Sequence, residues 1–303
     1  MAARMARPKL HPGQVDIDEG LVRRLLAAQF PAWAGLPLVP VASTGTVNAL
    51  YRLGNELVVR LPLVERWAPG VVNELAWLPR LAPALPLAVP EAVAAGEPGE
   101  GYPFRWAVFR WLDGETWSLD RVADPCRAAE ELAAFVQALR AVDPTGEPPP
   151  RPASHGGPLR DRDQGVRAAL AAAEGMVDTA AIEAAWEAAL EVPPDWDGSP
   201  VWVHGDLLAG NVLVRDGRLH AVIDWGGAGV GDPAANALAA WSLFRGESRK
   251  VYRAALAVDA DTWERGRGWA LTRIMNVPYY AEANPLFVED AKRTLTEALY
   301  FDE

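Results

Sequence analysis

The polar residues best suited to chemistry lie close together in the sequence. Asp206 stands in a glycine-containing turn, Asn211 follows it shortly, and Asp224 comes after a short apolar run. A carboxylate beside a metal-bound triphosphate can orient an attacking hydroxyl group or accept its proton. An amide oxygen and a second carboxylate suit Mg²⁺, which takes few protein ligands and keeps waters or phosphate oxygens around it. Any one of these residues alone could merely satisfy turn amides, but the set at this spacing favours a phosphoryl-transfer site.

A predicted hairpin would bring two of these side chains together. Two extended runs flank Asp216-Gly217, a residue pair typical of two-residue type I′ turns. With that pair as the loop, Asn211 faces Val222, and Asp224 lies one pleat further along the same face. We therefore expect the carboxamide of Asn211 and the carboxylate of Asp224 to converge on one point.

One motif in this region resembles a known family signature. It consists of His204-Gly205-Asp206, Asn211 and Ile223-Asp224-Trp225. The motif is similar to that of the aminoglycoside phosphotransferases and their choline-, homoserine-, methylthioribose- and macrolide-phosphorylating relatives, and it parallels the catalytic motifs of protein kinases. The resemblance implies a two-lobed, protein-kinase-like fold of the α+β class, with ATP or GTP and Mg²⁺ as cofactors. It also implies that Asp206 is the catalytic base and that Asn211 and Asp224 bind Mg²⁺. We expect His204 to be a packed, hydrogen-bonded side chain.

A second short match to the same family covers residues 231–234. The resemblance implies that Asp232 is a structural carboxylate that ties the following helix to the catalytic loop. Where the family has a further Asp, this chain has Asn236, so one charge of the family pattern is missing.

The first third of the sequence offers a cation and an acid for the nucleotide. Arg60 alternates with apolar residues in a predicted strand, and Glu74 lies on the apolar stripe of a predicted helix. A buried charge without a partner is costly, so we expect Arg60 and Glu74 to pair. In kinase-like sites such a pair holds the α- and β-phosphates, although a purely structural ion pair is an alternative. The family has Lys at the position of Arg60, and this chain has no lysine between Lys9 and Lys250.

Two loops are expected to complete the nucleotide site. Small residues in the first could bring backbone amides close to phosphate, although an ordinary turn fits as well. The second falls where the family has its adenine-binding linker. The candidate residues are Ser43, Thr44, Gly45 and Thr46 in the first loop and Arg110, Trp111 and Leu112 in the second.

The acceptor is expected between the catalytic loop and the later helices. The candidate contacts are Asp232, Asn236, Trp241 and Glu282. Acidic residues near the C-terminus could attract a polycation, but ordinary solvated helix faces explain them better. Tryptophans at helical spacing, including Trp225 and Trp263, are more typical of a core than of a stacking site.

The elements that must position these residues divide into two parts. Residues 15–112 predict a small sheet-rich N-lobe that binds nucleotide, with a hairpin turn at Gly54-Asn55. Residues 113–303 predict a mainly helical C-lobe that carries the catalytic loop and the acceptor site. Helices are expected over residues 16–30, 71–81, 124–142, 159–190 as two helices, 234–244, 248–256, 261–275 and 285–300.

Composition excludes several classes of protein. The 303-residue chain has a formal net charge of −11, which argues against non-specific binding to nucleic acid. The single cysteine, Cys126, fits a reducing cytoplasm and excludes an internal disulfide framework. We expect neither a membrane span nor a secretory signal, because no long apolar run is present.

These observations predict a cytoplasmic kinase that phosphorylates a hydroxyl group of a small molecule. An aminoglycoside is the leading acceptor on the resemblance alone. A macrolide, homoserine, choline or sugar acceptor is an alternative. The replacement of the family lysine by Arg60 leaves a second class open, a nucleotide-binding module without catalytic activity.

Overall fold

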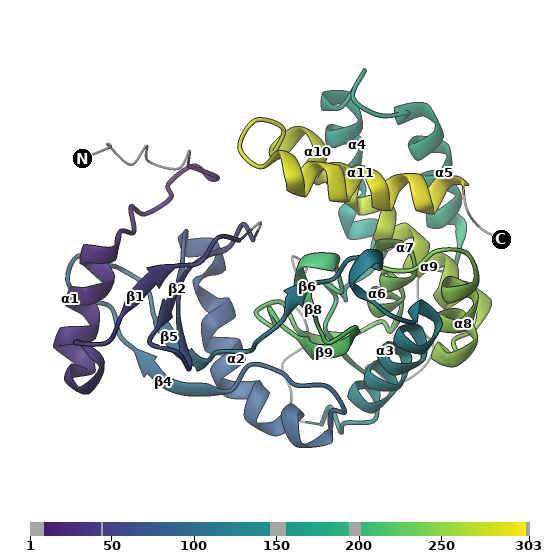
Figure 1. Cartoon of the computed structure of the whole chain (residues 1–303). Helices are drawn as coiled ribbons and strands as arrows, with labels where there is room; N and C mark the ends of the chain where they lie inside the picture. The colour runs from purple at the N-terminus through teal and green to yellow at the C-terminus, as the bar shows by residue number, and fades with distance from the viewer. Residues whose placement is uncertain (1–8, 44, 146–155, 194–200, 301–303) are drawn as a thin grey trace.

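The computed structural model describes residues 9–43, 45–145, 156–193 and 201–300, which form two lobes (Figure 1). The N-lobe holds a five-stranded antiparallel sheet with the strand order β1-β2-β3-β5-β4. Its strands are β1 (Leu38–Pro40), β2 (Asn48–Leu53), β3 (Leu57–Pro62), β4 (Ala92–Gly96) and β5 (Trp106–Arg110). Residues 111–114 link β5 to the C-lobe. The expected order, a sheet-rich lobe followed by a larger helical lobe, is confirmed.

Two helices cover opposite faces of this sheet. Helix α1 (Glu19–Gln29) packs against the face of β3 that carries Val59. Val58, on the other face, packs with the core to which helix α2 (Ala68–Leu81) contributes. Because side chains alternate along a strand, Arg60 lies on the same face as Val58, the face that α2 covers.

The turn between β2 and β3 differs from the predicted two-residue hairpin. Leu53 pairs with Leu57, so three residues, 54–56, form the loop. Gly54 takes up the left-handed conformation with φ of 60°, which a residue without a side chain adopts at little cost. Asn55 has no positive φ, whereas a type I′ turn requires one at both central residues. The prediction of a Gly54-Asn55 turn was therefore wrong, although both strands are present.

The C-lobe consists of two small sheets surrounded by helices. One sheet has the order β6-β8-β9, and the other pairs β7 with β10. The strands are β6 (Glu115–Thr116), β7 (Val201–Val203), β8 (Val212–Arg215), β9 (Arg218–Val222) and β10 (Gly229–Gly231). The helices are α3 (Pro125–Arg140), α4 (Asp163–Ala172), α5 (Thr179–Glu191), α6 (Ala234–Ala237), α7 (Ala239–Ser242), α8 (Gly246–Leu256), α9 (Ala260–Leu271), α10 (Asn276–Tyr279) and α11 (Pro285–Tyr300).

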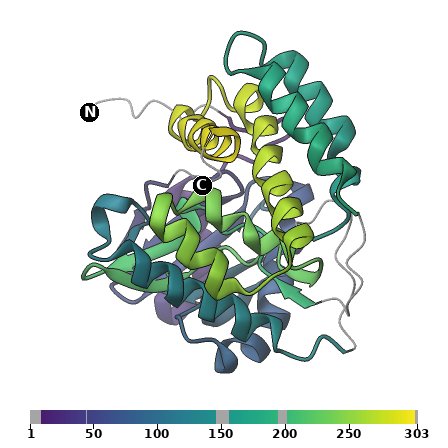
Figure 2. The same ribbon diagram turned by 90° about the vertical axis from the view of Figure 1, so that its right-hand side faces the viewer.

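Most predicted helices are confirmed, with one clear exception. The segment predicted as a single helix over 234–244 forms two short helices, α6 and α7. The amide of Asn236 bonds to the carbonyl of Pro233, and the amide of Trp241 bonds to that of Leu238. These bonds span three residues rather than four, so they tighten the segment and interrupt a regular α-helix. The helical pair α4 and α5 packs on α9 and the turn after it (Figure 2).

The hairpin formed by β8 and β9 has the predicted turn but not the predicted register. Arg215 pairs with Arg218, and φ is positive at both Asp216 and Gly217, as a two-residue type I′ turn requires. The pairing then shifts by one residue beside His220, and Val212, not Asn211, lies opposite Val222.

A contact between distant segments accompanies this bulge. The carbonyl of His220 accepts a hydrogen bond from Ala88 at 3.1 Å, and Val222 donates to the carbonyl of Ala88 at 2.9 Å. The extra residue turns these backbone groups toward the chain that leads to β4. The expectation that Asn211 faces Val222 was therefore wrong, since it assumed a regular ladder.

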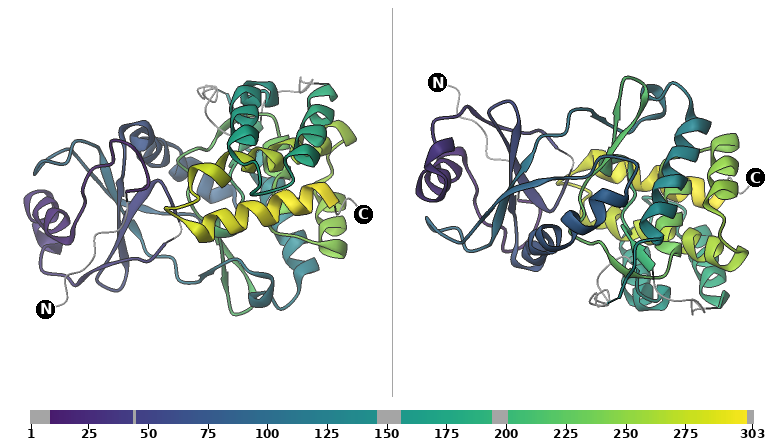
Figure 3. Two further views of the ribbon diagram at one scale, coloured as in Figure 1. Left: turned by 90° about the horizontal axis from the view of Figure 1, so that it is seen from above. Right: turned by 90° about the horizontal axis from the view of Figure 1, so that it is seen from below.

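The larger hydrophobic core continues from one lobe into the other. It includes Val71 and Leu78 of α2 together with Val203 and Trp225 of the C-lobe. Seen from above, the turn between α10 and α11 reaches toward the N-lobe (Figure 3). In the part of the chain that the structure describes, no helix is long and apolar enough to cross a membrane.

Candidate active site

The loop after β7 is held in place by backbone and buried polar contacts. His204 is fully buried; its Nε2 lies 3.0 Å from the carbonyl of Ile223, and its Nδ1 accepts the amide of Asp206 at 3.2 Å. The side-chain oxygen of Asn236 accepts the amides of His204 and Gly205 at 3.0 and 3.1 Å. The expected structural role of His204 is confirmed. Asn236 is 0% exposed and anchors the loop, and its contact with the acceptor stays a prediction.

Asp206 and Asn211 are in direct contact. The Nδ2 group of Asn211 donates to the carbonyl of Asp206 at 2.9 Å and to its Oδ2 at 2.8 Å. Burial raises the pKa of Asp206, and the negative charge of Asp224 adds to that effect. The positive charge of Arg273 and the bond from Asn211 act in the opposite direction. Asp206 is thus an acid whose proton affinity exceeds that of an ordinary aspartate, as suits a group that must accept a proton.

Asp224 lies next to this pair, at the start of a sharp turn. The amide of Ile223 donates to the carbonyl of Asn211 at 2.9 Å, which places Asp224 one residue beyond a partner of Asn211. Asp224 has φ of 65°, a left-handed conformation that aspartate tolerates better than most residues. Its side chain remains one-third exposed. The structure thus gathers Asp206, Asn211 and Asp224 in one place, as predicted.

Arg60 connects the N-lobe to this group. Its NH1 donates to Oε1 of Glu74 at 2.6 Å, and its NH2 pairs with Oδ1 of Asp224. The Asn48 amide, oriented with its oxygen toward these donors, accepts from Nε and NH2 of Arg60 at 2.8 Å. Burial lowers the pKa of Arg60, but Glu74 and Asp224 outweigh it and the net pKa is raised. The predicted pairing of Arg60 with Glu74 is confirmed, and it extends to Asp224.

A close approach of backbones brings Glu74 to the catalytic segment. A Cβ atom added at Gly226 would lie 3.1 Å from the Cα atom of Gly70 in α2, so neither position has room for a side chain. Asn73 donates to the carbonyl of Gly226 at 3.3 Å. At this separation Oε1 of Glu74 also accepts the amide of Trp225 at 2.7 Å. Helix α2 is therefore attached to the residue after Asp224 as well as to β3.

The residues around Asp224 fit a magnesium ion. Because Asn211 uses its nitrogen to bond Asp206, its side-chain oxygen is directed away from that contact. Asp224 uses Oδ1 for Arg60 and has a second carboxylate oxygen. Both are hard oxygen donors of the kind Mg²⁺ prefers. Among the described residues, no group of three or more His, Cys, Asp or Glu side chains could hold a metal ion.

The two loops predicted to bind nucleotide, residues 43–46 and 110–112, make contacts that are also found in ordinary turns and strand ends. Ser43 accepts the amide of Gly45 at 2.9 Å, a bond found in ordinary turns, and Thr44 lies outside the described residues. Thr46 is buried, and its carbonyl contacts Nε2 of His11. A phosphate-binding role for residues 43–46 stays a prediction.

The linker amides are partly occupied. The amide of Arg110 donates to the carbonyl of Glu91 at 2.9 Å, and that of Trp111 donates to Glu56 at 2.7 Å. These bonds hold the linker to strands of the N-lobe. The adenine-binding role of Arg110, Trp111 and Leu112 stays a prediction.

Two of the remaining acceptor candidates are structural. Both oxygens of Asp232 bind Arg265 of α9, at 2.6 Å for Oδ2 and 3.2 Å for Oδ1, and Oδ1 also caps the amide of Ala234. Trp241 is 1% exposed and packs on Trp263 at 4.7 Å between ring centroids. Asp232 is thus paired with Arg265 and Trp241 is covered, and their contact with the acceptor stays a prediction.

Glu282, the last acceptor candidate, is exposed, whereas Trp225 and Trp263 are buried. Glu282 is exposed in the segment between α10 and α11, and its role stays a prediction. Trp225 is 2% exposed and packs on His204 with ring centroids 4.8 Å apart. The interpretation of the tryptophans as core residues is confirmed.

The sequence reasoning missed two groups of interacting polar residues, one that includes Arg273 and one around His11. Arg273 influences the pKa of Asp206, and Tyr280 stands in the same group of interacting side chains. His11 lies 3.1 Å from the hydroxyl of Tyr279, and Arg66 donates to the same hydroxyl at 2.9 Å. An arginine inside the apolar run of residues 269–275 was a signal for Arg273, since a charge in such a run needs a purpose.

Comparisons of the sequence and the fold with known proteins point to one family and to several similar solved structures. The sequence matches the model of the phosphotransferase enzyme family over residues 39–269. Curated proteins give no match. The fold is similar to the GDP and kanamycin complex of APH(2")-IIia, with a TM-score of 0.70 and 18% identity over 91% of this chain and 97% of that chain.

Two further solved structures show the same likeness. The streptomycin-ATP-APH(2")-IIa ternary complex is 18% identical, with a TM-score of 0.60 over 86% of this chain and 91% of that chain. Macrolide 2'-phosphotransferase MphH from Brachybacterium faecium is 24% identical, with a TM-score of 0.58 over 94% of this chain and 99% of that chain. At these identities the shared property is the fold.

Proposed function

The chain belongs to the phosphotransferase enzyme family, and on that premise we propose that it transfers the γ-phosphoryl group of ATP or GTP to a hydroxyl group of a small molecule. The bond between the γ-phosphorus and the bridging oxygen breaks, and a bond from phosphorus to the acceptor oxygen forms. The hydroxyl proton passes to Asp206, and ADP or GDP leaves. Asn211 and Asp224 would hold Mg²⁺, which neutralises developing charge on the phosphate oxygens.

The observation that carries this proposal is the junction of two lobes at Asp224. From the C-lobe, Asn211 bonds Asp206 at 2.8 Å; from the N-lobe, Arg60 joins Glu74 to Asp224. A nucleotide with its phosphates beside Arg60 would present the γ-phosphate toward Asp206. The carboxylates of Asp206 and Asp224 and the amide of Asn211 thus support the positioning of reactants and the stabilisation of charge. These are the two main sources of rate acceleration in phosphoryl transfer.

The acceptor class is a finer part of the proposal. Aminoglycosides are the first class to test, since kanamycin, gentamicin and streptomycin occur in complexes of similar structures. Macrolides are the second, since macrolide 2'-phosphotransferases have the same fold. Homoserine-, choline- and sugar-type alcohols are further alternatives. A need for ATP or GTP, together with the single Cys126, supports a cytoplasmic location.

A coupled assay of ADP or GDP release tests the function. Aminoglycosides, macrolides, amino alcohols and sugars are offered with Mg²⁺ and either nucleotide, and the product is identified by mass. Asp206→Ala should lower turnover by about 1,000-fold, because general-base catalysis contributes on this order. Nucleotide affinity should stay within about twofold, since the base contacts the acceptor rather than the nucleotide.

The control for this assay is Asp120→Ala, which removes an exposed carboxylate of a surface turn. This variant should keep full turnover. Wild-type turnover by Asp206→Ala would remove Asp206 from its proposed role. Nucleotide binding without transfer to any hydroxyl compound would favour the alternative of a non-catalytic module.

A further inference from the structure

The guanidinium of Arg60 has a third partner besides its two carboxylates. Its NH1 donates to Oε1 of Glu74 at 2.6 Å, and its NH2 pairs with Oδ1 of Asp224. The side-chain oxygen of Asn48 accepts from both Nε and NH2 of Arg60, each at 2.8 Å. Of the five N–H donors of an arginine, one thus meets Glu74, one meets Asp224 and two meet Asn48. The partner that accepts the most bonds from Arg60 is therefore neutral.

The strand register brings Asn48 to this place. Asn48 is the first residue of β2, and Leu50, two residues further on, pairs with Arg60 of β3. Side chains two residues apart lie on one face of a sheet, so Asn48 and Arg60 are diagonal neighbours on the face that α2 covers. From there the carboxamide oxygen meets the edge of the guanidinium formed by Nε and NH2. Asn48 thus occupies this edge without adding a charge to the site.

The edge formed by Nε and NH2 is one with which an arginine can hold both oxygens of a carboxylate. In that arrangement two parallel hydrogen bonds form a fork. Among the described residues, the hydrogen bond between Arg60 and Asp224 joins NH2 to Oδ1 only, so no fork is formed there. The side chain of Asp224 is 33% exposed, whereas that of Glu74 is 0% exposed. Of these two carboxylates, Asp224 is therefore the one that a ligand from solvent can reach.

Arg265 shows what a guanidinium does when this edge meets a carboxylate. Its Nε donates to Oδ2 of Asp232 at 2.6 Å, and its NH2 donates to Oδ1 at 3.2 Å. Both side chains are largely buried, so solvent competes little for these bonds. A fork of this kind engages both oxygens of its carboxylate.

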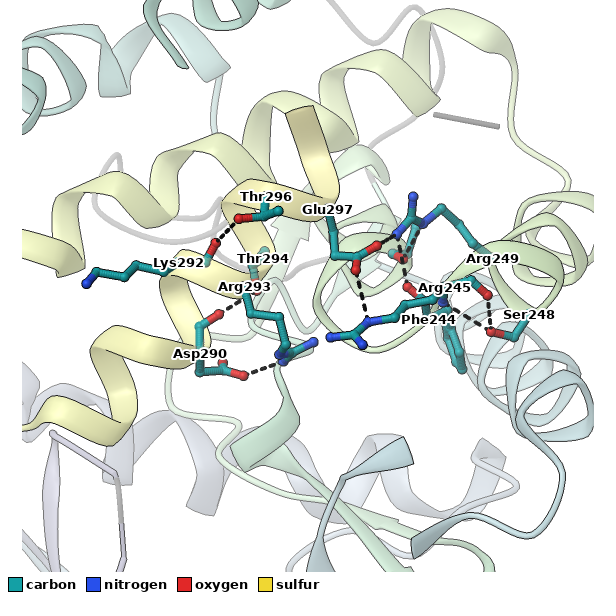
Figure 4. Close-up of polar contacts among 11 residues, drawn as sticks. Phe244, Arg245, Ser248, Arg249, Asp290, Lys292, Arg293, Thr294, Thr296 and Glu297 are labelled. Carbon is teal, nitrogen blue, oxygen red and sulfur yellow. Dashed lines mark hydrogen bonds and ion pairs between the residues drawn. The ribbon is translucent and has the colours of Figure 1, made fainter. Parts of the chain in front are cut away.

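Arg249 shows the opposite case, in which a neutral acceptor takes the Nε group. Its Nε donates to the carbonyl of Ala240 at 3.0 Å, and its NH2 reaches Glu297 through Oε2. The other oxygen of Glu297 is left to Arg245, whose Nε lies 2.9 Å from Oε1 (Figure 4). Glu297 is 7% exposed, so the prediction of solvated acidic faces near the C-terminus was wrong for this residue. With its Nε group on a neutral acceptor, an arginine thus leaves the second carboxylate oxygen to another cation.

Resting on the proposed phosphoryl transfer, we propose that Asn48 is a positioning residue that keeps the second oxygen of Asp224 free of Arg60 and open to Mg²⁺. With Asn48 on Nε and NH2 and Glu74 on NH1, neither edge of the guanidinium can close a fork on the carboxylate. Arg60 then orients Asp224 through Oδ1 alone, and the other oxygen remains a hard donor of the kind Mg²⁺ prefers. Without Asn48, the edge formed by Nε and NH2 would take both oxygens.

The need for Asn48 follows from the arginine at position 60. The family has Lys at this position, and a lysine ammonium is a compact charge without a planar fork. It therefore cannot hold both oxygens of Asp224 in the parallel arrangement. The inference predicts that Asn48 controls the metal site when position 60 is Arg and loses that control when it is Lys.

The first test measures how nucleotide binding depends on Mg²⁺. A non-hydrolysable ATP analogue is titrated into the protein by calorimetry at stepped Mg²⁺ concentrations, which gives the half-saturating Mg²⁺ concentration without turnover. Asn48→Leu removes the acceptor at similar size and should raise this concentration by about 10-fold, the usual effect of one charge-assisted hydrogen bond. Asn48→Asp keeps an oxygen acceptor and should not raise it. The matched control is Asn55→Leu in the exposed turn between β2 and β3, which should leave it unchanged.

The same substitution in an Arg60→Lys background separates positioning from folding. Adding Asn48→Leu to Arg60→Lys should change the half-saturating Mg²⁺ concentration by less than about twofold, because no fork remains to be blocked. Urea denaturation of each variant shows whether it is folded. A merely structural Asn48 would shift both backgrounds equally, or would lower stability with no shift in Mg²⁺. Either result would overturn the inference.

The outcomes distinguish this inference from the function on which it rests. A Mg²⁺ shift in Asn48→Leu that disappears with Lys at position 60, in a protein that phosphorylates no hydroxyl compound, would support the role of Asn48 and remove the transfer step. Wild-type turnover by Asn48→Leu at an unchanged half-saturating Mg²⁺ concentration would overturn the role of Asn48 and keep the transfer. Nucleotide binding that does not respond to Mg²⁺ in the unmodified protein would overturn both.

Discussion

Two arginines that are buried to a similar extent, Arg60 and Arg273, have different surroundings. Arg60 is 8% exposed and is paired with Glu74 and Asp224. Arg273 is 7% exposed and rests on Asn276 and Phe287, which are neutral. The net pKa of Arg60 is raised because two carboxylates outweigh its burial, whereas burial lowers the pKa of Arg273.

The difference separates a charge that is paired with internal carboxylates from one that is held by neutral groups. A cation with two internal partners is part of the architecture, and its contact with Glu74 locks α2 to β3. A cation with neutral partners ties fewer elements together, because no buried carboxylate depends on it. The surroundings of Arg60 are therefore built from internal ion pairs, and those of Arg273 are not.

Stability measurements provide the strongest challenge to this contrast. Arg60→Met should lower the free energy of unfolding by about 3 kcal/mol or more, because it leaves the fully buried Glu74 without its cation. Arg273→Met should change it by about 1 kcal/mol or less, since no buried carboxylate loses an ion pair. Urea denaturation of both variants measures the difference. Equal losses would mean that Arg273 is as structural as Arg60.

A glycine substitution tests whether the position of α2 controls the ion pair between Glu74 and Arg60. Gly226→Ala forces a Cβ against the backbone of Gly70 at 3.1 Å, so α2 must move and take Glu74 with it. We expect a loss of about 1 to 3 kcal/mol, the usual cost of overpacking, together with weaker nucleotide binding. Fluorescent-nucleotide titration measures the binding. Gly35→Ala is the control, because nothing lies within 4 Å of its added Cβ. Unaltered nucleotide affinity in Gly226→Ala would separate α2 from the nucleotide end.

The smallest expected effect concerns the contact between His11 and the hydroxyl group of Tyr279. Burial lowers the pKa of His11 below its usual 6.5, and the charge of Arg66 adds to this. The unfolded chain therefore binds a proton more readily than the folded one. The contact's contribution is complete above about pH 6.5 and is lost as the pH falls through the lowered pKa of the folded state.

Hydrogen exchange at different pH values measures this effect. Residues 9–15 should lose protection between pH 7.5 and 5.5, after correction for intrinsic exchange rates, while β3 should not. His11→Gln should remove the pH dependence, since glutamine does not titrate. Equal protection of residues 9–15 at both pH values in the unmodified protein would contradict the role of His11.

Local patterns in the sequence predict much of the site. Asp206, Asn211 and Asp224 are close in sequence around a turn whose residues are specific, so their grouping follows from short-range geometry. The pairing of Arg60 with Glu74 follows from burial, because both lie on apolar faces of their elements. The structure bears out both groupings.

Long-range contacts explain what the sequence does not predict. The bulge at His220 depends on Ala88, which is distant in the chain. In the sequence, Asn236 resembles an accessible polar residue. In the structure, its side-chain oxygen accepts hydrogen bonds from the amides of His204 and Gly205. Arg273 has no local signal beyond its place in the apolar run of residues 269–275. Each depends on where a separate segment lies, and hydrophobic periodicity does not encode that.

The ion pairs that join Glu74, Arg60 and Asp224 carry a net charge, and this charge affects how a triphosphate could approach them. One guanidinium and two carboxylates carry formal charges of +1, −1 and −1, a sum of −1. A bare triphosphate would meet like charge at this bridge, whereas a triphosphate complexed with a divalent cation brings the opposite sign to Asp224. Under the proposed function, the bridge would admit a triphosphate more readily when a metal accompanies it. Without that metal, Arg60 is the counter-ion of Asp224.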